Sequence, residues 1–209
     1  VLAILLALVA TGYFAWRLGQ DAAEAFEDPV AHFKYGSTGG DRNFGLPYVM
    51  WEAMPHLFRD LMPEGRADEG WAAFGFLYED EAALPPEMKL RRPVGTSLRN
   101  HMGVDRIFLN CAGCHAGQVR DAGGVPHIVP GAPSNTVDLS AFQDFLAAAV
   151  VDERFTGDRF IAEIDHLGLE LDLVNRLALQ FIGVAIVRER LLSIVDRFDF
   201  VAHEPAYGP

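Results

Sequence analysis

The sequence predicts a mainly α-helical protein with an N-terminal transmembrane helix, residues 1–20, followed by one domain, residues 21–209. Three observations favour this class. The first sixteen residues carry no charge, the apolar residues after position 136 recur at helical spacing, and no stretch shows a convincing strand pattern. Half of the 209 residues are hydrophobic, which is enough for a sizeable core and argues against disorder.

The first segment is interpreted as an uncleaved anchor. A transmembrane helix needs roughly 17–25 apolar residues, so the uncharged run from Val1 is just long enough when upstream residues extend it. Tyr13 and Trp16 suit an aromatic belt at the membrane surface. A cleaved signal peptide is the alternative, but its cleavage site needs small residues where this chain has Leu8 or Tyr13.

Residues 21–104 are predicted to be loop-rich. Prolines at positions 29, 47, 55 and 63 and the glycine-rich run at 36–40 interrupt the segment, and that run lacks the Gly-Lys-Ser/Thr ending of a phosphate loop. Short helices are expected over 48–54 and 56–62, separated by Pro55 or with Pro55 in the first turn of the second.

Residues 105–135 form the predicted functional core, with 105–115 leading into a helix that ends near residues 121–124. The pattern Cys111-Ala112-Gly113-Cys114-His115 is the C-x-x-C-H signal for covalent attachment of haem c. Thiols at i and i+3 lie on one face of a helical turn and can bond both vinyl groups of one porphyrin, with His115 as the proximal iron ligand. Zinc would need further ligands, because these are the only two cysteines, and a structural disulfide leaves His115 unexplained.

The sixth ligand of the iron is less determined. All five methionines precede the motif, which excludes a downstream methionine. We expect His127, in a proline-braced loop, to be the distal ligand, so the predicted metal ligands are His115 and His127. His166 or His203, the upstream Met102, or an open position are the alternatives, and the histidines at positions 32, 56 and 101 are weaker candidates.

Residues 136–209 are predicted to be helical. Asn135 or Thr136 caps a first helix, Thr156 caps a second that ends at Gly168, and a third runs from about residue 171 to 198. The uncharged centre of the third helix is too short to cross a bilayer, so we expect it to pack against the domain.

The net charge of −12, with only two lysines beside fifteen arginines, excludes a nucleic-acid-binding role, which needs clustered basic residues. An acidic surface favours encounter with a basic redox partner, or merely maintains solubility.

Five stretches resemble bacterial c-type cytochromes of the group related to di-haem cytochrome c peroxidases and rubber oxygenases. They are residues 35–39, 45–51, 75–79, 105–115 and 130–136. The resemblance implies a cytochrome c-like helical haem domain, with haem bonded to Cys111 and Cys114 and with His115 as its ligand. Members of the group carry a second C-x-x-C-H, which this sequence lacks; either a second haem domain follows residue 209 or the protein works with one haem.

The motif and the anchor together predict a membrane-anchored c-type cytochrome that carries single electrons. It would sit in the bacterial inner membrane with its haem domain on the periplasmic side, as a subunit or partner of a larger respiratory or photosynthetic complex. A haem peroxidase or oxygenase with an open iron site is the alternative.

Overall fold

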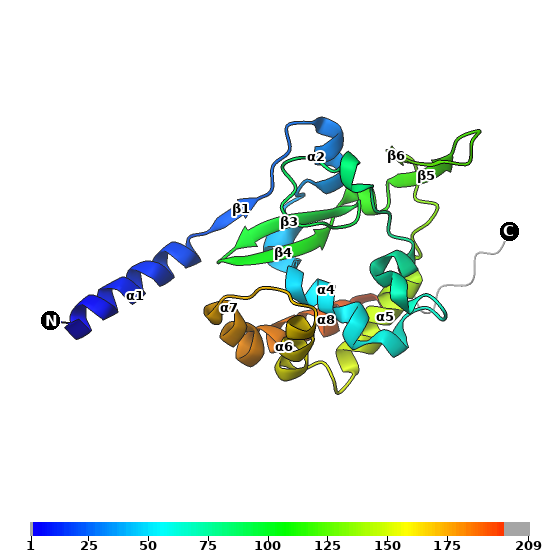
Figure 1. Ribbon diagram of the computed structural model, residues 1–209. Coiled ribbons are helices and arrows are strands. Elements are labelled where there is room, and N and C mark those ends of the chain that lie inside the picture. Colours follow the sequence, from blue (N-terminus) through cyan, green and yellow to red (C-terminus); the bar gives the residue numbers. More distant parts are fainter. Residues whose placement is uncertain (1, 199–209) are drawn as a thin grey trace. The chain divides into compact units, whose positions relative to one another are not determined.

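The computed structural model describes residues 2–198. The chain forms two compact units: the first comprises Val1–Trp51 and Gly75–Val137, and the second comprises Glu52–Phe74 and Asp138–Pro209. About 52% of the structure is helix and 14% is strand, in two sheets (Figure 1). The prediction of a mainly α-helical fold without strands is therefore wrong, and the protein has a mixed α/β fold.

The predicted membrane anchor is also corrected. Residues Leu2–Leu18 form one helix, α1, of 17 residues. No helix in residues 2–198 is both long and apolar enough to span a membrane. The prediction of a transmembrane protein anchored in an inner membrane is thus contradicted.

The first unit is built on a four-stranded antiparallel sheet with the order β1-β3-β4-β2. Its strands are β1 (Asp21–Ala23), β2 (Leu46–Pro47), β3 (Thr96–His101) and β4 (Val104–Leu109). Met102 and Gly103, at φ 54° and 71°, make the two-residue turn between β3 and β4, the connection whose twist matches such hairpins. Residues 105–110, before the cysteines, were expected to lead into a helix. Residues 105–109 belong to strand β4 instead, because their backbone hydrogen bonds go to β3.

Two helices and a hairpin complete this unit. Helix α2 (Pro29–Tyr35) begins after Asp28, whose carboxylate accepts from the Ala31 N–H, and α3 (Gly40–Phe44) follows. Strands β5 (Ala116–Arg120) and β6 (Pro126–Pro130) form an antiparallel hairpin. The predicted break at residues 121–124 is the turn of this hairpin, and the loop expected around His127 is β6. A short 3₁₀ turn, η3, spans Glu81–Ala83.

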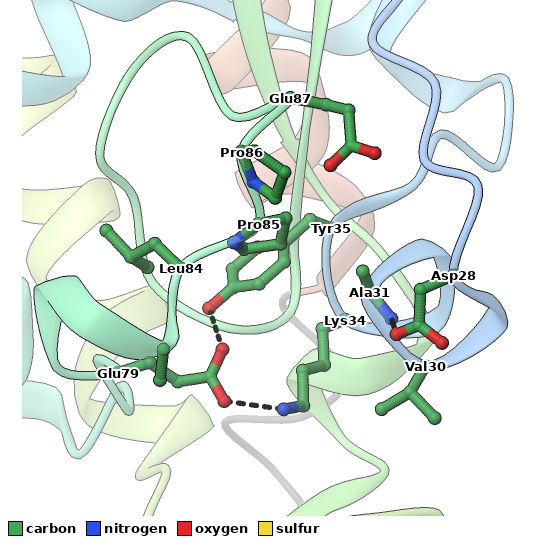
Figure 2. A pocket seen from close by; sticks show the side chains of 11 residues that line it. Asp28, Val30, Ala31, Lys34, Tyr35, Glu79, Leu84, Pro85, Pro86 and Glu87 are labelled. Carbon is green, nitrogen blue, oxygen red and sulfur yellow. Dashed lines mark hydrogen bonds and ion pairs between the residues drawn. The ribbon is translucent and has the colours of Figure 1, made fainter.

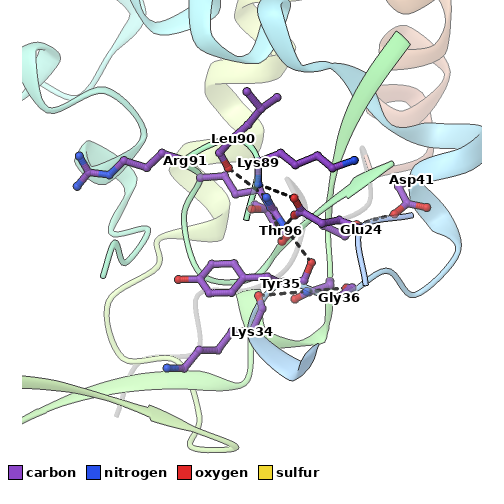
Figure 3. Close-up of polar contacts among 12 residues, drawn as sticks. Glu24, Lys34, Tyr35, Gly36, Asp41, Lys89, Leu90, Arg91 and Thr96 are labelled. Carbon is purple, nitrogen blue, oxygen red and sulfur yellow. Dashed lines mark hydrogen bonds and ion pairs between the residues drawn. The ribbon is translucent and has the colours of Figure 1, made fainter. Parts of the chain in front are cut away.

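An ion pair lies fully inside this unit. Glu24 and Arg92 are bonded to one another, with side chains 3% and 0% exposed (Figure 3). Arg92 also donates to three carbonyls, and its guanidinium lies 5.5 Å from the ring centre of Tyr35. Glu24 accepts from the Lys89 N–H at 2.6 Å. Burial lowers the pKa of Arg92, and the carboxylate of Glu24 opposes that shift. Every charge in this cluster is thus compensated.

The second unit is helical. Its elements are most of α4 (Tyr48–Leu57), η1 (Arg59–Leu61), η2 (Ala67–Phe74), α5 (Leu139–Val151), α6 (Gly157–His166), α7 (Leu173–Ala178), the π-helical η5 (Leu179–Gly183) and α8 (Val184–Phe198). Pro55 lies inside α4 instead of separating two helices. Thr156 precedes α6 as expected, but α5 is capped by Asp138, which accepts from the Ala141 N–H.

Phenylalanine rings form the centre of this unit. The ring of Phe58 stacks on that of Phe155 at 5.9 Å and meets those of Phe145 and Phe160 edge-on. The helical spacing of the sequence places nine apolar residues on inward faces. Phe142, Phe145, Phe160, Ile161 and Ile164 are buried, Val137, Leu146 and Leu167 are partly buried, and Leu139 is exposed. The helical spacing of the sequence was therefore a reliable guide in this unit, where contacts follow the local period.

We expect the stability of the second unit to fall in acid through Asp152. The guanidinium of Arg154 hydrogen-bonds this carboxylate at 2.7 Å and lowers the pKa of Asp152 to about 2. A carboxyl whose pKa is lowered by folding stabilises the fold at any pH above its pKa in the unfolded chain, about 4. This contribution disappears as the pH falls toward 2. Urea unfolding from about pH 5 to about pH 2 should show a shallower acid loss in Asp152→Asn than in the unmodified protein. Glu153→Gln, the exposed neighbour, is the control; equal slopes in Asp152→Asn and the unmodified protein would contradict this role.

Candidate functional site

The C-x-x-C-H motif forms a single exposed turn between the two sheets of the first unit. Residues Cys111–Gly113 are a 3₁₀ turn, η4, and the carbonyl of Cys111 accepts from the N–H groups of both Cys114 and His115, at 3.2 and 3.0 Å. The side chains of Cys111, Cys114 and His115 are exposed, whereas Ala112 and Gly113 are buried. The three predicted haem-binding residues are therefore all exposed within one turn of the chain.

Asn110 holds the beginning of this turn. Its side-chain oxygen accepts from the Ala112 N–H at 2.9 Å, and its amide nitrogen donates to the carbonyls of Lys34 and Gly36 at 3.2 and 3.0 Å. Both carbonyls lie at the end of α2, so one buried amide connects the turn to that helix. A side-chain oxygen placed this way is the usual N-cap arrangement.

Two glycine backbones meet on the inner side of the turn. Gly95 has φ 90°, in the left-handed region, and a Cβ there would lie 2.3 Å from the Cα of Gly113. The Gly95 carbonyl accepts from the Asn110 N–H, and its N–H donates to the Lys34 carbonyl. Only glycine allows the two backbones to come this close, so the motif packs directly against the segment around Gly95.

The segment after β6 holds the other end of the motif. The carbonyls of His115 and Cys114 accept from the N–H groups of Gly131 and Ser134, at 2.7 and 2.9 Å. The side-chain amide of Asn135 pairs with both backbone groups of Gln118 at 2.8 Å, as a neighbouring strand would. Asn135 thus stabilises the edge of β5 and does not cap α5, where the sequence had placed it as a candidate.

The inner face of the turn rests on a small apolar core. Ala112 and Ala116 pack with Phe26, Tyr35 and Val94, all nearly or fully buried. Ile128 of β6 packs against the same cluster. Helix α2 and the β5–β6 hairpin therefore support the turn from beneath, and Cys111, Cys114 and His115 remain exposed.

The predicted distal ligand His127 lies on the neighbouring hairpin. It pairs with Val119 in β5, and its side chain, 55% exposed, is hydrogen-bonded to Asp121 at 3.0 Å. That hydrogen bond also lowers the pKa of Asp121. The segment after β6 crosses the same hairpin face, since a Cβ on Gly117 would lie 2.7 Å from the Pro133 carbonyl oxygen. His115 and His127 thus belong to different elements, the turn after η4 and strand β6, and the ligand role of His127 stays a prediction.

The other candidate ligands lie elsewhere. Met102 is at the turn between β3 and β4, so the six residues of β4, roughly 20 Å of strand, separate it from the motif. His101 is beside it and faces Asp21. His32 is an exposed residue of α2, while His56 and His166 belong to the second unit. His203 is outside the described residues.

A metal centre made of protein ligands is not part of this site. Among residues 2–198, no three or more His, Cys, Asp or Glu side chains are grouped so that they could hold a metal ion. The expectation of a metal-binding protein is therefore corrected for a site made of protein side chains alone. A porphyrin differs in its requirements, because it supplies four ligands itself and takes only one or two from the protein.

A cavity of about 280 Å³ lies between α2 and the segment around η3 (Figure 2). Inside it, the two oxygens of Glu79 accept from Lys34 Nζ at 2.5 Å and from the Tyr35 hydroxyl at 2.8 Å. Burial, and then the hydrogen bond to Glu79, raises the pKa of Tyr35 well above its usual range. These polar groups satisfy one another, so the cluster fixes α2 behind the motif.

No protein-family model, curated protein or solved structure matches this chain. The resemblance to c-type cytochromes therefore stays an expectation that depends on the residues themselves.

Sequence reasoning missed the residues that hold the turn, Asn110 and Gly95. Asn110 carried a usable signal, because asparagine directly before a short helical turn is a favoured N-cap. Gly95 carried none, since its role depends on the approach of Gly113 from eighteen positions along the chain.

Proposed function

We propose that this protein is a c-type haem protein that carries single electrons, with haem bonded through Cys111 and Cys114 and with His115 as the proximal ligand. The observation that carries the proposal is the single turn that presents both thiols and the imidazole outward while its two middle residues are buried. Bound haem would supply one-electron redox chemistry at its iron.

The residues present fit this group. Both cysteines are free and exposed, so each thiol is accessible to a vinyl group. Two hydrogen bonds to the Cys111 carbonyl close the turn, and the Gly131 N–H holds the carbonyl of His115. Backbone hydrogen bonds therefore hold the three residues whose side chains would bond the haem, which is the positioning that a covalent haem site requires.

The charge of the chain favours a basic partner. A net charge of −12 creates a negative potential that steers a positively charged redox protein toward the surface and repels nucleic acid. The partner that we propose is thus a redox protein or complex with a basic docking face, and its association should weaken as salt is added.

The proposal is tested by expressing the chain in a bacterial host that attaches haem c. We expect the denatured protein to keep its pigment in acidic acetone and to stain for haem on a denaturing gel. The double variant Cys111→Ala/Cys114→Ala should lose the stain, whereas Met102→Ala, at the distant turn, should keep it. Pigment that acidic acetone extracts from the unmodified protein would refute the proposal.

A haem enzyme with an open iron position is a second candidate, and one observation favours it. Met102 lies at the far end of β4, so six residues of strand separate this candidate ligand from the motif. Adding carbon monoxide to the reduced protein distinguishes the two functions: a shifted Soret band indicates an open iron, and an unchanged band indicates a six-coordinate electron carrier.

A further inference from the structure

The attachment turn is held from inside by one side chain that the haem proposal does not use. Asn110 is 9% exposed, and all three of its side-chain hydrogen bonds go to backbone groups. One of them ends on Ala112, between the two cysteines. The other two end on the carbonyls of Lys34 and Gly36.

These contacts affect the two thiols differently. The bond to the Ala112 N–H closes the turn at its first residue, and the bonds to α2 prevent the turn from rotating away from the core. Cys114 is held separately, because its carbonyl accepts from the Ser134 N–H. The Cys111 carbonyl joins the two ends of the turn by accepting from the Cys114 N–H, and Asn110 holds the end that carries Cys111.

We propose that Asn110 is a positioning residue that sets the spacing of the two thiols so that both react with the same porphyrin. The inference rests on the proposed function. It names the residue that determines whether both thiols bond the same porphyrin. In each attachment the S–H of a cysteine adds across one vinyl group. An S–C bond forms, the C=C π bond breaks and the hydrogen ends on the terminal vinyl carbon, so no oxidant or reductant is consumed.

The chemistry of the amide explains why asparagine suits this position. The position requires one acceptor for the Ala112 N–H and two donors for the carbonyls of Lys34 and Gly36. The asparagine side chain provides all three. Serine can accept from Ala112 as an N-cap but has a single donor, and alanine has neither group. The Lys34 carbonyl keeps the Gly95 N–H as a donor, whereas the Gly36 carbonyl loses the bond from Asn110. Losing that donor and the acceptor for the Ala112 N–H is costly, so these variants should populate the closed turn less, by about tenfold for alanine.

The experiment counts thioethers in haem-bearing chains. Purified Asn110→Ser and Asn110→Ala are denatured, treated with a maleimide and weighed by mass spectrometry, because a chain with one thioether keeps one reactive thiol. We expect the singly bonded fraction to rise about fivefold or more in Asn110→Ala and less in Asn110→Ser. The pyridine haemochrome band should shift in parallel, which a general loss of stability would not cause.

The matched control is Asn100→Ser, which changes the same residue type in the preceding β3–β4 hairpin, where Asn100 donates to Asp105 at 2.8 Å. It should keep two thioethers. If Asn110→Ala fails to fold, Asn110→Ser, which retains the cap, is compared with the unmodified protein by its singly bonded fraction. Asn110 variants with the unmodified ratio of thioethers would overturn the inference, whereas an unmodified protein without covalent haem would overturn the proposed function instead.

Discussion

Replacing Arg92 by methionine is expected to destabilise the first unit by about 3–5 kcal/mol, because Glu24 would then be an unpaired charge inside the protein. Three backbone carbonyls would also lose a donor. The free energy of unfolding, measured by urea denaturation followed by circular dichroism, checks this value. Since an ordinary domain is stable by only about 5–15 kcal/mol, part of the variant should be unfolded before urea is added.

Two comparisons isolate the cause. The double variant Arg92→Met/Glu24→Met removes both charges and should recover much of the loss, although the Lys89 N–H loses its acceptor. Arg42→Met removes the exposed partner of Asp21 in the same unit and should cost less than about 1 kcal/mol. A loss below about 1 kcal/mol in Arg92→Met would show that the pair is not buried as described.

Replacing His115 by alanine should separate haem attachment from iron ligation. The thioethers form through Cys111 and Cys114, so the variant should still stain for haem. Without the imidazole, the iron loses its proximal ligand, and we expect an altered Soret band and binding of carbon monoxide. Visible spectra of the ferric and ferrous protein, with and without carbon monoxide, provide the measurement.

The control for this variant is His166→Ala, which removes an exposed histidine of the second unit. Its spectrum should equal that of the unmodified protein. His127→Ala then tests the distal ligand: a changed spectrum supports ligation by His127, and an unchanged one assigns the sixth position elsewhere. Identical spectra for His115→Ala and the unmodified protein would remove His115 from the site.

The sequence located the candidate site because its signal is local. Cys111, Cys114 and His115 fall within five residues, so any helical turn places their side chains close together, and the structure shows all three exposed in one turn. The helices of the second unit were predictable for the same reason. Phe160 and Ile164 are one turn apart, and a helical period alone predicts that both face inward.

Tertiary structure decided the rest. Strand β4 was missed because its pairing with β3 depends on partners elsewhere in the chain and not on a local period. The anchor prediction was wrong because no helix in residues 2–198 is both long and apolar enough to span a membrane. Apart from the local bond between Asn110 and Ala112, the contacts of Asn110, Gly95 and Asn135 join groups that are 15 to 76 positions apart. A sequence by itself thus determines the chemistry that neighbouring residues carry, whereas the folded chain determines how that chemistry is held, since hydrogen bonds and close packing join distant segments.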